Sequence, residues 1–204
     1  NPMATVCWSL ADTGIECVGL CHGVQTTIRL IAGYLELPVA DIDYVCAGIN
    51  HMAWFTRLEH QGQNLYPALR DLFDKPEYYA NEKVRGEVFR QFGYFMTEST
   101  GHLSEYLPYF RKNSLGMATY CDEPNFGGET AACLKWSRIL AKKYDGADML
   151  KDEPIELPAR SVEYGSYIIE AVACRRNFCF NGNVMNRGLI SNLPADCCVE
   201  VPVF

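Results

Sequence analysis

The sequence lacks a long uncharged apolar run, an excess of basic residues and any Cys-x-x-Cys pair. Without about 18 consecutive apolar residues, no membrane-spanning helix is predicted. A formal net charge of −7 argues against a protein that binds nucleic acid through its phosphate backbone. We therefore expect neither a membrane nor a nucleic acid as a partner.

Motifs that would reveal a nucleotide site or a serine hydrolase are also missing. The chain contains no GxGxxG or GxxxxGK[ST] phosphate loop and no GxSxG elbow. No Ser-His-Asp triad can be assembled from its four histidines. A cofactor-binding loop, if the protein needs one, is not in these residues.

The chain has no initiator Met and no signal-peptide pattern. It opens on Asn1-Pro2 and closes on the apolar, strand-like run 199–204. Both ends are typical of the interior of a longer chain, so we expect this sequence to be an internal piece.

Cysteine is abundant, with ten residues in a chain that is 49% apolar. Disulfide frameworks stabilise small secreted domains that cannot build a core, whereas 204 residues suffice for one. Cys197 and Cys198 are neighbours in sequence. We predict that most of the cysteines are reduced, buried, small apolar residues, and we expect a cytoplasmic protein.

Apolar periodicity predicts a mixed fold of the α+β (mixed α/β) class. A helical stripe of apolar residues follows Cys21-His22-Gly23 and ends before Pro38; its members are Val24, Ile28, Ile31 and Leu35. Further helices are predicted near 64–75, 80–92, 130–144 and 162–173. Strands are predicted at 3–7, weakly at 12–18, at 43–48 and within 177–204, and loops at 93–101 and 113–130.

Cys21 and His51 are the strongest metal candidates, because a thiolate and an imidazole on two segments can share one divalent ion. Cys21 precedes the predicted helix, and a helix N-terminus favours the thiolate over the thiol. Two residues alone are nevertheless a weak signal. A buried cysteine and a hydrogen-bonded histidine explain the pair more simply.

His22 is a candidate general acid or base, since imidazole gains and loses its proton near neutral pH. A capping or surface histidine is the simpler interpretation. A second polar group lies in and after a Gly/Ser/Thr loop and comprises Glu98, His102, Glu105 and Tyr106. Polar groups beside an aromatic wall are typical of a sugar pocket, although a solvated loop would explain them as well.

Several segments of the chain together resemble one enzyme family. In order they are Asn1-Pro2-Met3, Cys21-His22-Gly23-Val24, Gly48-Ile-Asn-His-Met-Ala-Trp54, Gly93-Tyr-Phe-Met-Thr-Glu-Ser99, Glu105-Tyr106 and Asn192-Leu-Pro-Ala-Asp196 through Pro202. They look like the NAD- and manganese-dependent glycoside hydrolases of family 4, on the branch of melibiase-type α-galactosidases. The resemblance covers nearly the whole chain.

The resemblance implies a catalytic domain like the C-terminal domain of lactate dehydrogenase, placed after a Rossmann domain. Residues 1–20 would be the tail end of the NAD-binding Rossmann domain. Residues 21–204 would be the catalytic, substrate- and metal-binding domain, incomplete at its C-terminus. We expect this piece alone to be inactive, and the whole protein to be a homo-oligomer, either a dimer or a tetramer.

The reaction that the resemblance implies begins with hydride transfer from C3 of the sugar to NAD⁺. Loss of the C2 proton, elimination at C1, addition of water and return of the hydride follow. A divalent metal ion on the C2 and C3 oxygens would stabilise negative charge as a Lewis acid. This chemistry differs from the two-carboxylate mechanism of most glycosidases.

The resemblance also assigns roles to individual residues. The metal ligands would be Cys21 and His51. Asn1 would contact both the sugar and NAD, and His22 would contact the sugar and protonate the leaving group, a role that an Asp has in the phospho-α-glucosidase branch. Asn50 and Glu98 would also bind substrate. For the base at C2, Tyr106 is the first candidate, followed by His102 and Glu98.

The substrate is expected to be an α-galactoside. The Cys21-His22 pair differs from the patterns of the phospho-glycosidases, while Gly23 stands where a typical α-galactosidase has Ser. An α-glucuronidase or α-glucosidase therefore stays open as an alternative. A non-catalytic sugar-binding or oligomerisation module is the alternative from another functional class.

Overall fold

The computed structural model describes residues 3–121, 128–144, 160 and 163–204. The chain divides into two compact units, Asn1–Ser99 with Glu163–Phe204, and Thr100–Val162. None of the described helices has both the length and the apolar character needed to cross a bilayer. The predicted boundary between residues 20 and 21 stays a prediction.

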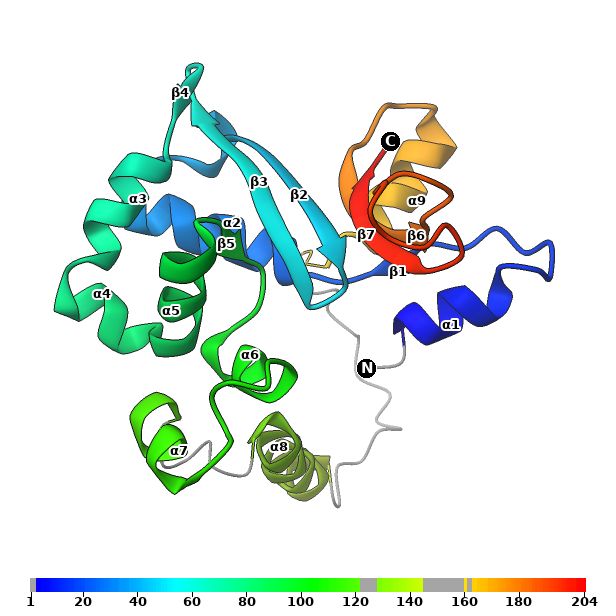
Figure 1. Cartoon of the computed structure of the whole chain (residues 1–204). Coiled ribbons are helices and arrows are strands. Elements are labelled where there is room, and N and C mark those ends of the chain that lie inside the picture. Colours follow the sequence, from blue (N-terminus) through cyan, green and yellow to red (C-terminus); the bar gives the residue numbers. More distant parts are fainter. Residues whose placement is uncertain (1–2, 122–127, 145–159, 161–162) are drawn as a thin grey trace. The chain divides into compact units, whose positions relative to one another are not determined.

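A seven-stranded antiparallel sheet organises the first unit (Figure 1). Its main order is β1-β6-β7-β2-β3-β4, and β5 pairs with β3. The strands are β1 (Gly19–Leu20), β2 (Asp43–Ile49), β3 (Met52–His60), β4 (Gln63–Asn64), β5 (Phe95–Met96), β6 (Phe180–Met185) and β7 (Cys198–Val203). The β2–β3 and β6–β7 pairs meet where Gly48 lies opposite Glu200.

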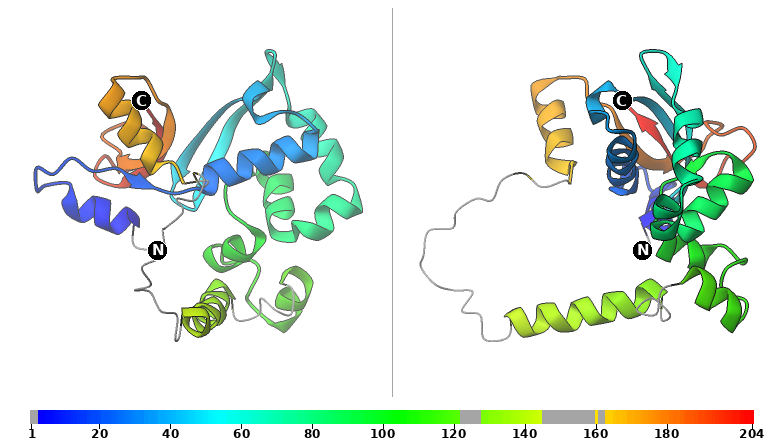
Figure 2. Two further views of the ribbon diagram at one scale, coloured as in Figure 1. Left: turned by 180° about the vertical axis from the view of Figure 1, so that it is seen from behind. Right: turned by 90° about the vertical axis from the view of Figure 1, so that its left-hand side faces the viewer.

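Helices surround this sheet within the first unit (Figure 2). They are α1 (Met3–Leu10), α2 (Gly23–Leu35), the 3₁₀ turn η1 (Val39–Asp41), α3 (Tyr66–Phe73), α4 (Pro76–Asn81), α5 (Lys83–Phe92) and α9 (Gly165–Cys174). The second unit contains α6 (Thr100–Tyr106), α7 (Ser114–Tyr120) and α8 (Gly128–Tyr144). The predicted α+β class is confirmed.

Helix α2 follows the predicted apolar stripe and supplies one side of the core. Val24, Ile28 and Ile31 are buried and join one cluster with Cys46 and Phe55 of the β2–β3 hairpin. Burial of each large aliphatic side chain contributes about 1.5–3 kcal/mol. This packing fixes the start of α2, and therefore the residues just before it, against the hairpin.

An aromatic cluster joins β5 to the helices. The rings of Phe73, Phe89 and Phe95 meet edge to face, with centroids 5.4–5.6 Å apart. The Tyr66 hydroxyl donates to the Phe55 carbonyl and accepts the Phe95 N–H at 3.2 Å. The chain leaving β5 therefore starts from a rigid position.

Most of the predicted regular elements are confirmed, with shifted ends. The helices predicted near 64–75, 80–92, 130–144 and 162–173 correspond to α3, α5, α8 and α9, and the predicted strand 43–48 and terminal strands correspond to β2, β6 and β7. The strand predicted at 3–7 is wrong, because these residues form α1. A five-residue apolar run fits either structure, and only packing against β6 and β7 decides between them.

Four other sequence predictions are corrected. Residues 12–18 form turns and irregular chain, because the first strand of the sheet begins only at Gly19. The predicted loop 93–101 includes β5 and the start of α6, and the predicted loop 113–130 includes α7 and the start of α8, its residues 122–127 lying outside the described part. All ten cysteines are free thiols as expected, but Cys17, Cys133, Cys174 and Cys179 are exposed.

Candidate metal centre

His51 lies in a two-residue turn, Asn50-His51, between the paired ends Ile49 and Met52 of the β2–β3 hairpin. Its φ of 65° is left-handed, a conformation that is costly for a residue with a side chain. Gly48 makes the tight approach before the turn possible, since a Cβ there would lie 2.7 Å from the Ala53 Cα. The hairpin therefore presents His51 at its tip in a fixed, strained backbone conformation.

Cys21 lies between β1 and the start of α2 and is half-buried. Buried Tyr164 holds its backbone: the hydroxyl accepts the Cys21 N–H at 3.2 Å and lies 2.8 Å from the Cys21 carbonyl oxygen, to which it can donate. The Cys21 Sγ accepts the Gly23 N–H at 3.5 Å. The thiol is thus directed toward the first turn of α2.

Glu98, just beyond β5, brings a carboxylate to the same place. Its Oε1 lies 3.7 Å from the His51 Nδ1. A Cβ at Gly23 would lie 3.2 Å from this oxygen and 3.5 Å from the Cys21 Sγ. The absence of a side chain at position 23 therefore leaves a small gap that the thiol and the carboxylate both border.

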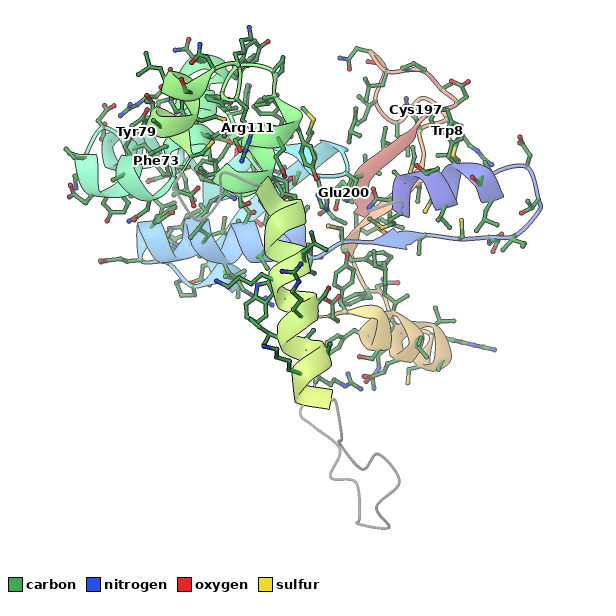
Figure 3. The ribbon with its side chains drawn as sticks, turned by 90° about the horizontal axis from the view of Figure 1, so that it is seen from below. Trp8, Phe73, Tyr79, Arg111, Cys197 and Glu200 are labelled. Atoms are coloured by element: carbon green, nitrogen blue, oxygen red, sulfur yellow. The ribbon has the colours of Figure 1, made fainter. Side chains whose placement is uncertain are left out.

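Glu200 adds a second carboxylate from β7, where Figure 3 labels it. The side chain is 1% exposed, and its Oε2 accepts the Asn50 amide at 3.3 Å. Its buried Oε1 has no hydrogen-bond partner within the described part of the chain. Burial, together with the Glu98 charge, raises the pKa of Glu200 to about 7, although the hydrogen bond from Asn50 lowers it.

The electrostatic setting of Cys21 corrects the sequence prediction of a thiolate favoured by the helix. Burial raises the pKa of Cys21, and the charges of Glu200 and Glu98 raise it further, outweighing the hydrogen bonds from Gly23 and Asn50 that lower it. The same carboxylates would attract a cation, and a bound cation deprotonates a coordinating thiol. The site is unfavourable for a free thiolate and favourable for a metal ion.

These residues fit a divalent ion. They combine a soft sulfur, an imidazole nitrogen and carboxylate oxygens, which is a donor set used for transition metals. The buried Oε1 of Glu200, which has no hydrogen-bond partner in the described part of the chain, is consistent with a bound cation. Of the predicted site residues, Glu98 lies beside His51, and its Oε1 and the Cys21 Sγ both lie close to Gly23.

The structure also describes His22, His102 and Tyr106, but not Asn1. His22 precedes α2 without a side-chain capping bond, and its Nδ1 pairs with the Glu163 Oε1 at 3.1 Å, both side chains being more than half exposed. His102 and Tyr106 belong to the second unit, where their rings meet edge to face at 5.6 Å. Asn1 lies outside the described residues.

Two residues of this region escaped prediction from the sequence as functional residues. Glu200 was detectable, since it is the single charged residue within the apolar strand β7. Tyr164 gave no such signal, because it reads as an ordinary residue near a helix start and lies 143 positions from Cys21. Only the fold reveals what it holds.

Comparison with known proteins decides the family. The model of the family 4 glycosyl hydrolase C-terminal domain matches residues 46–204. The chain belongs to glycoside hydrolase family 4. The family resemblance seen in the sequence is therefore confirmed.

Individual relatives align with almost the whole of this chain. The α-galactosidases of Rhizobium meliloti (strain 1021) and Bacillus subtilis (strain 168) are each 37% identical, over 100% and 98% of this chain and 43% and 46% of their own lengths. The structure is similar to a 6-phospho-α-glucosidase from gut microorganisms in complex with NAD and Mn²⁺, with a TM-score of 0.68 and 18% identity over 99% of this chain and 49% of that one. The chain spans less than half the length of these relatives.

Proposed function

We propose that this chain forms the metal- and sugar-binding part of an α-galactosidase that depends on NAD and a divalent metal, in the first place Mn²⁺. The observation that carries the proposal is the position of the Glu98 Oε1, which lies 3.7 Å from the His51 Nδ1 and, like the Cys21 Sγ, lies close to Gly23. The two α-galactosidases at 37% identity support the substrate. The structural neighbour in complex with NAD and Mn²⁺ supports the cofactors.

The chain's own residues would divide the work around the sugar. Bound NAD and metal would supply reversible oxidation at C3 and Lewis-acid stabilisation of the charge that then develops. Cys21 and His51 hold the ion. Asn1 and Asn50 contact the sugar, with Asn1 also facing the cofactor, and Glu98 is a further candidate for sugar contact.

Two proton transfers remain for the protein. His22 protonates the leaving group, and because its Nδ1 is paired with Glu163, the sugar oxygen would meet its Nε2. Tyr106 removes the C2 proton, with His102 as the second candidate. Glu98, the third candidate, has its Oε1 3.7 Å from the His51 Nδ1.

The test is hydrolysis of p-nitrophenyl α-galactoside by the full-length protein, with and without NAD⁺ and Mn²⁺. We expect turnover only with both, and its loss in Cys21→Ser. Cys174→Ser, which changes an exposed thiol on α9, is the matched control and should keep full activity. Turnover that survives removal of both cofactors, or a fully active Cys21→Ser variant, would contradict the proposal.

The alternatives give different results in the same assay. An α-glucuronidase or an α-glucosidase would hydrolyse the corresponding p-nitrophenyl glycoside faster than the galactoside. A non-catalytic module would bind Mn²⁺ or a sugar and hydrolyse none of the three, even with NAD⁺ present.

A homo-oligomeric state and a cytoplasmic location stay predictions. The ten free thiols support a reducing compartment. Light scattering of the purified full-length protein and cell fractionation check the two predictions separately.

A further inference from the structure

The segment that carries Glu98 is held by its backbone from three sides. The Thr97 N–H donates to the Ala53 carbonyl at 3.0 Å. The Thr27 hydroxyl of α2 donates to the Thr97 carbonyl, and the Arg85 Nε of α5 donates to the Glu98 carbonyl. Thr27, Thr97 and Arg85 are all buried, so these bonds are shielded from water.

Burying the charged side chain of Arg85 has a free-energy cost that one hydrogen bond to a carbonyl does not explain. Arg85 is 4% exposed, and desolvation of its guanidinium costs several kcal/mol unless the group is paired. Glu82 pairs with it at 3.2 Å and also accepts the Tyr34 hydroxyl at 3.2 Å, while the Phe95 ring lies 5.3 Å from its Cζ. A buried ion pair is a poor source of stability. The Arg85–Glu82 pair is therefore better explained by its effect on the path of the segment that carries Glu98.

The hydrogen bonds from Thr27 and Arg85 form a backbone clamp that fixes the position of Glu98. Glu98 is 9% exposed. Its Oε1 is 3.7 Å from the His51 Nδ1, beyond the usual range of a hydrogen bond. Two donors that each lie about 2.0–2.2 Å from one ion are separated by roughly 3–4 Å. The spacing fits two ligands of a shared ion better than a direct hydrogen bond.

The thiol of Cys21 is the other donor near the Glu98 carboxylate. The Cys21 Sγ and the Glu98 Oε1 both border the gap that the missing side chain of Gly23 leaves, at 3.5 and 3.2 Å from the position of its Cβ. We propose that Glu98 is a third protein donor to the divalent ion of Cys21 and His51, and that Thr27 and Arg85 are positioning residues that present it. The inference rests on the proposed metal site and moves Glu98 from the sugar to the ion.

The first experiment measures Mn²⁺ affinity of the full-length protein by electron paramagnetic resonance of free Mn²⁺, without sugar. Glu98→Gln should weaken binding by roughly 10–100-fold, the scale seen when groups around a metal are altered. In the Co²⁺-loaded protein it should also change the visible d–d bands while the thiolate-to-cobalt band stays. Unchanged affinity in Glu98→Gln, with Cys21→Ser still defective, would overturn this inference alone. Unchanged affinity in Cys21→Ser would overturn the metal site itself.

The second experiment tests the clamp by a double-mutant cycle. Arg85→Lys should lower Mn²⁺ affinity several-fold in the wild-type background and not at all in Glu98→Gln. Equal losses in both backgrounds would mean that Arg85 supports the fold generally. Arg90→Lys is the matched control, since Arg90 lies on the same helix and donates to the Phe73 carbonyl at 2.7 Å, away from Glu98.

Thr27→Val keeps the test decisive if the Arg85 variant fails to fold. It removes only the hydroxyl that donates to the Thr97 carbonyl and nearly conserves the side-chain shape. The same several-fold loss, again absent in the Glu98→Gln background, is expected. A Thr27→Val protein with wild-type affinity would remove Thr27 from the proposed clamp.

Discussion

The hydroxyl of Tyr164 meets both backbone polar groups of Cys21, at 3.2 Å from its nitrogen and 2.8 Å from its oxygen. A residue beside α9 thereby fixes the thiol that precedes α2. The same hydroxyl lies 3.0 Å from the Asn181 carbonyl of β6. Tyr164 therefore joins the start of α2 to the β6–β7 side of the sheet.

Tyr164→Phe should destabilise the fold by about 1–3 kcal/mol, because it leaves buried partners unsatisfied. Mn²⁺ affinity should fall as well, since Cys21 loses its anchor. Urea unfolding and Mn²⁺ titration measure the two effects. Tyr94→Phe, at a half-exposed ring of the same unit, is the control and should be neutral. Equal behaviour of the two variants would contradict the anchoring role.

Gly48→Ala should be strongly destabilising. Its Cβ would meet backbone atoms, the Ala53 Cα at 2.7 Å and the Met52 oxygen at 2.8 Å, at a φ of 157°. We expect a loss of about 1–3 kcal/mol or more. Gly33→Ala in α2 is the matched comparison, because its Cβ has open space and alanine favours a helix by up to about 1 kcal/mol. Denaturant unfolding should show a lower free energy of unfolding for Gly48→Ala and a higher one for Gly33→Ala, each relative to the parent.

Gly23→Ala should weaken metal binding without unfolding the protein. The new Cβ would enter the gap, 3.2 Å from the Glu98 Oε1, and push the carboxylate away by a few tenths of an ångström. Mn²⁺ affinity should drop several-fold while the midpoint of urea unfolding stays near that of the parent. An unchanged affinity would show that the ion does not use this gap.

Glu200→Gln should change how stability depends on pH. In the folded protein the pKa of Glu200 is raised to about 7, whereas the unfolded carboxyl ionises near its ordinary value of 4.5. The folded state thus holds the proton more tightly, and stability falls as pH rises from about 4.5 to 7, by on the order of 3 kcal/mol.

The amide cannot ionise and still accepts a hydrogen bond from Asn50. Glu200→Gln should therefore be more stable than the parent at pH 8 and similar to it at pH 4.5, in EDTA. Urea unfolding across this range is the measurement. Parallel stability curves for the two proteins would contradict the raised pKa.

His22→Gln should separate catalysis from stability. The pair with Glu163 is more than half exposed on both sides, so its loss should cost no more than about 1 kcal/mol. Mn²⁺ affinity should be unchanged, whereas kcat should fall for substrates with a poorly activated leaving group. If His22→Gln keeps the parent's kcat on a galactoside with a sugar leaving group, His22 is excluded as the proton donor.

Local patterns predicted the parts of the fold that rest on local physics. The stripe from Val24 to Leu35 predicted α2, and the apolar run after Asp43 predicted β2, because each pattern matches the period of its element. The run 3–7 was too short to show a period, and its helix depends on packing against β6 and β7.

The sequence by itself determined the family and singled out Cys21 and His51 as metal candidates, because the residue types and their order carry that information. Only the tertiary structure decided what surrounds the pair. Glu98, Glu200 and Tyr164 come from three distant segments, and no sequence spacing encodes their meeting. Sheet pairing places Glu200 and the buried Arg85 holds the Glu98 segment, and burial then raises the pKa of the Cys21 thiol.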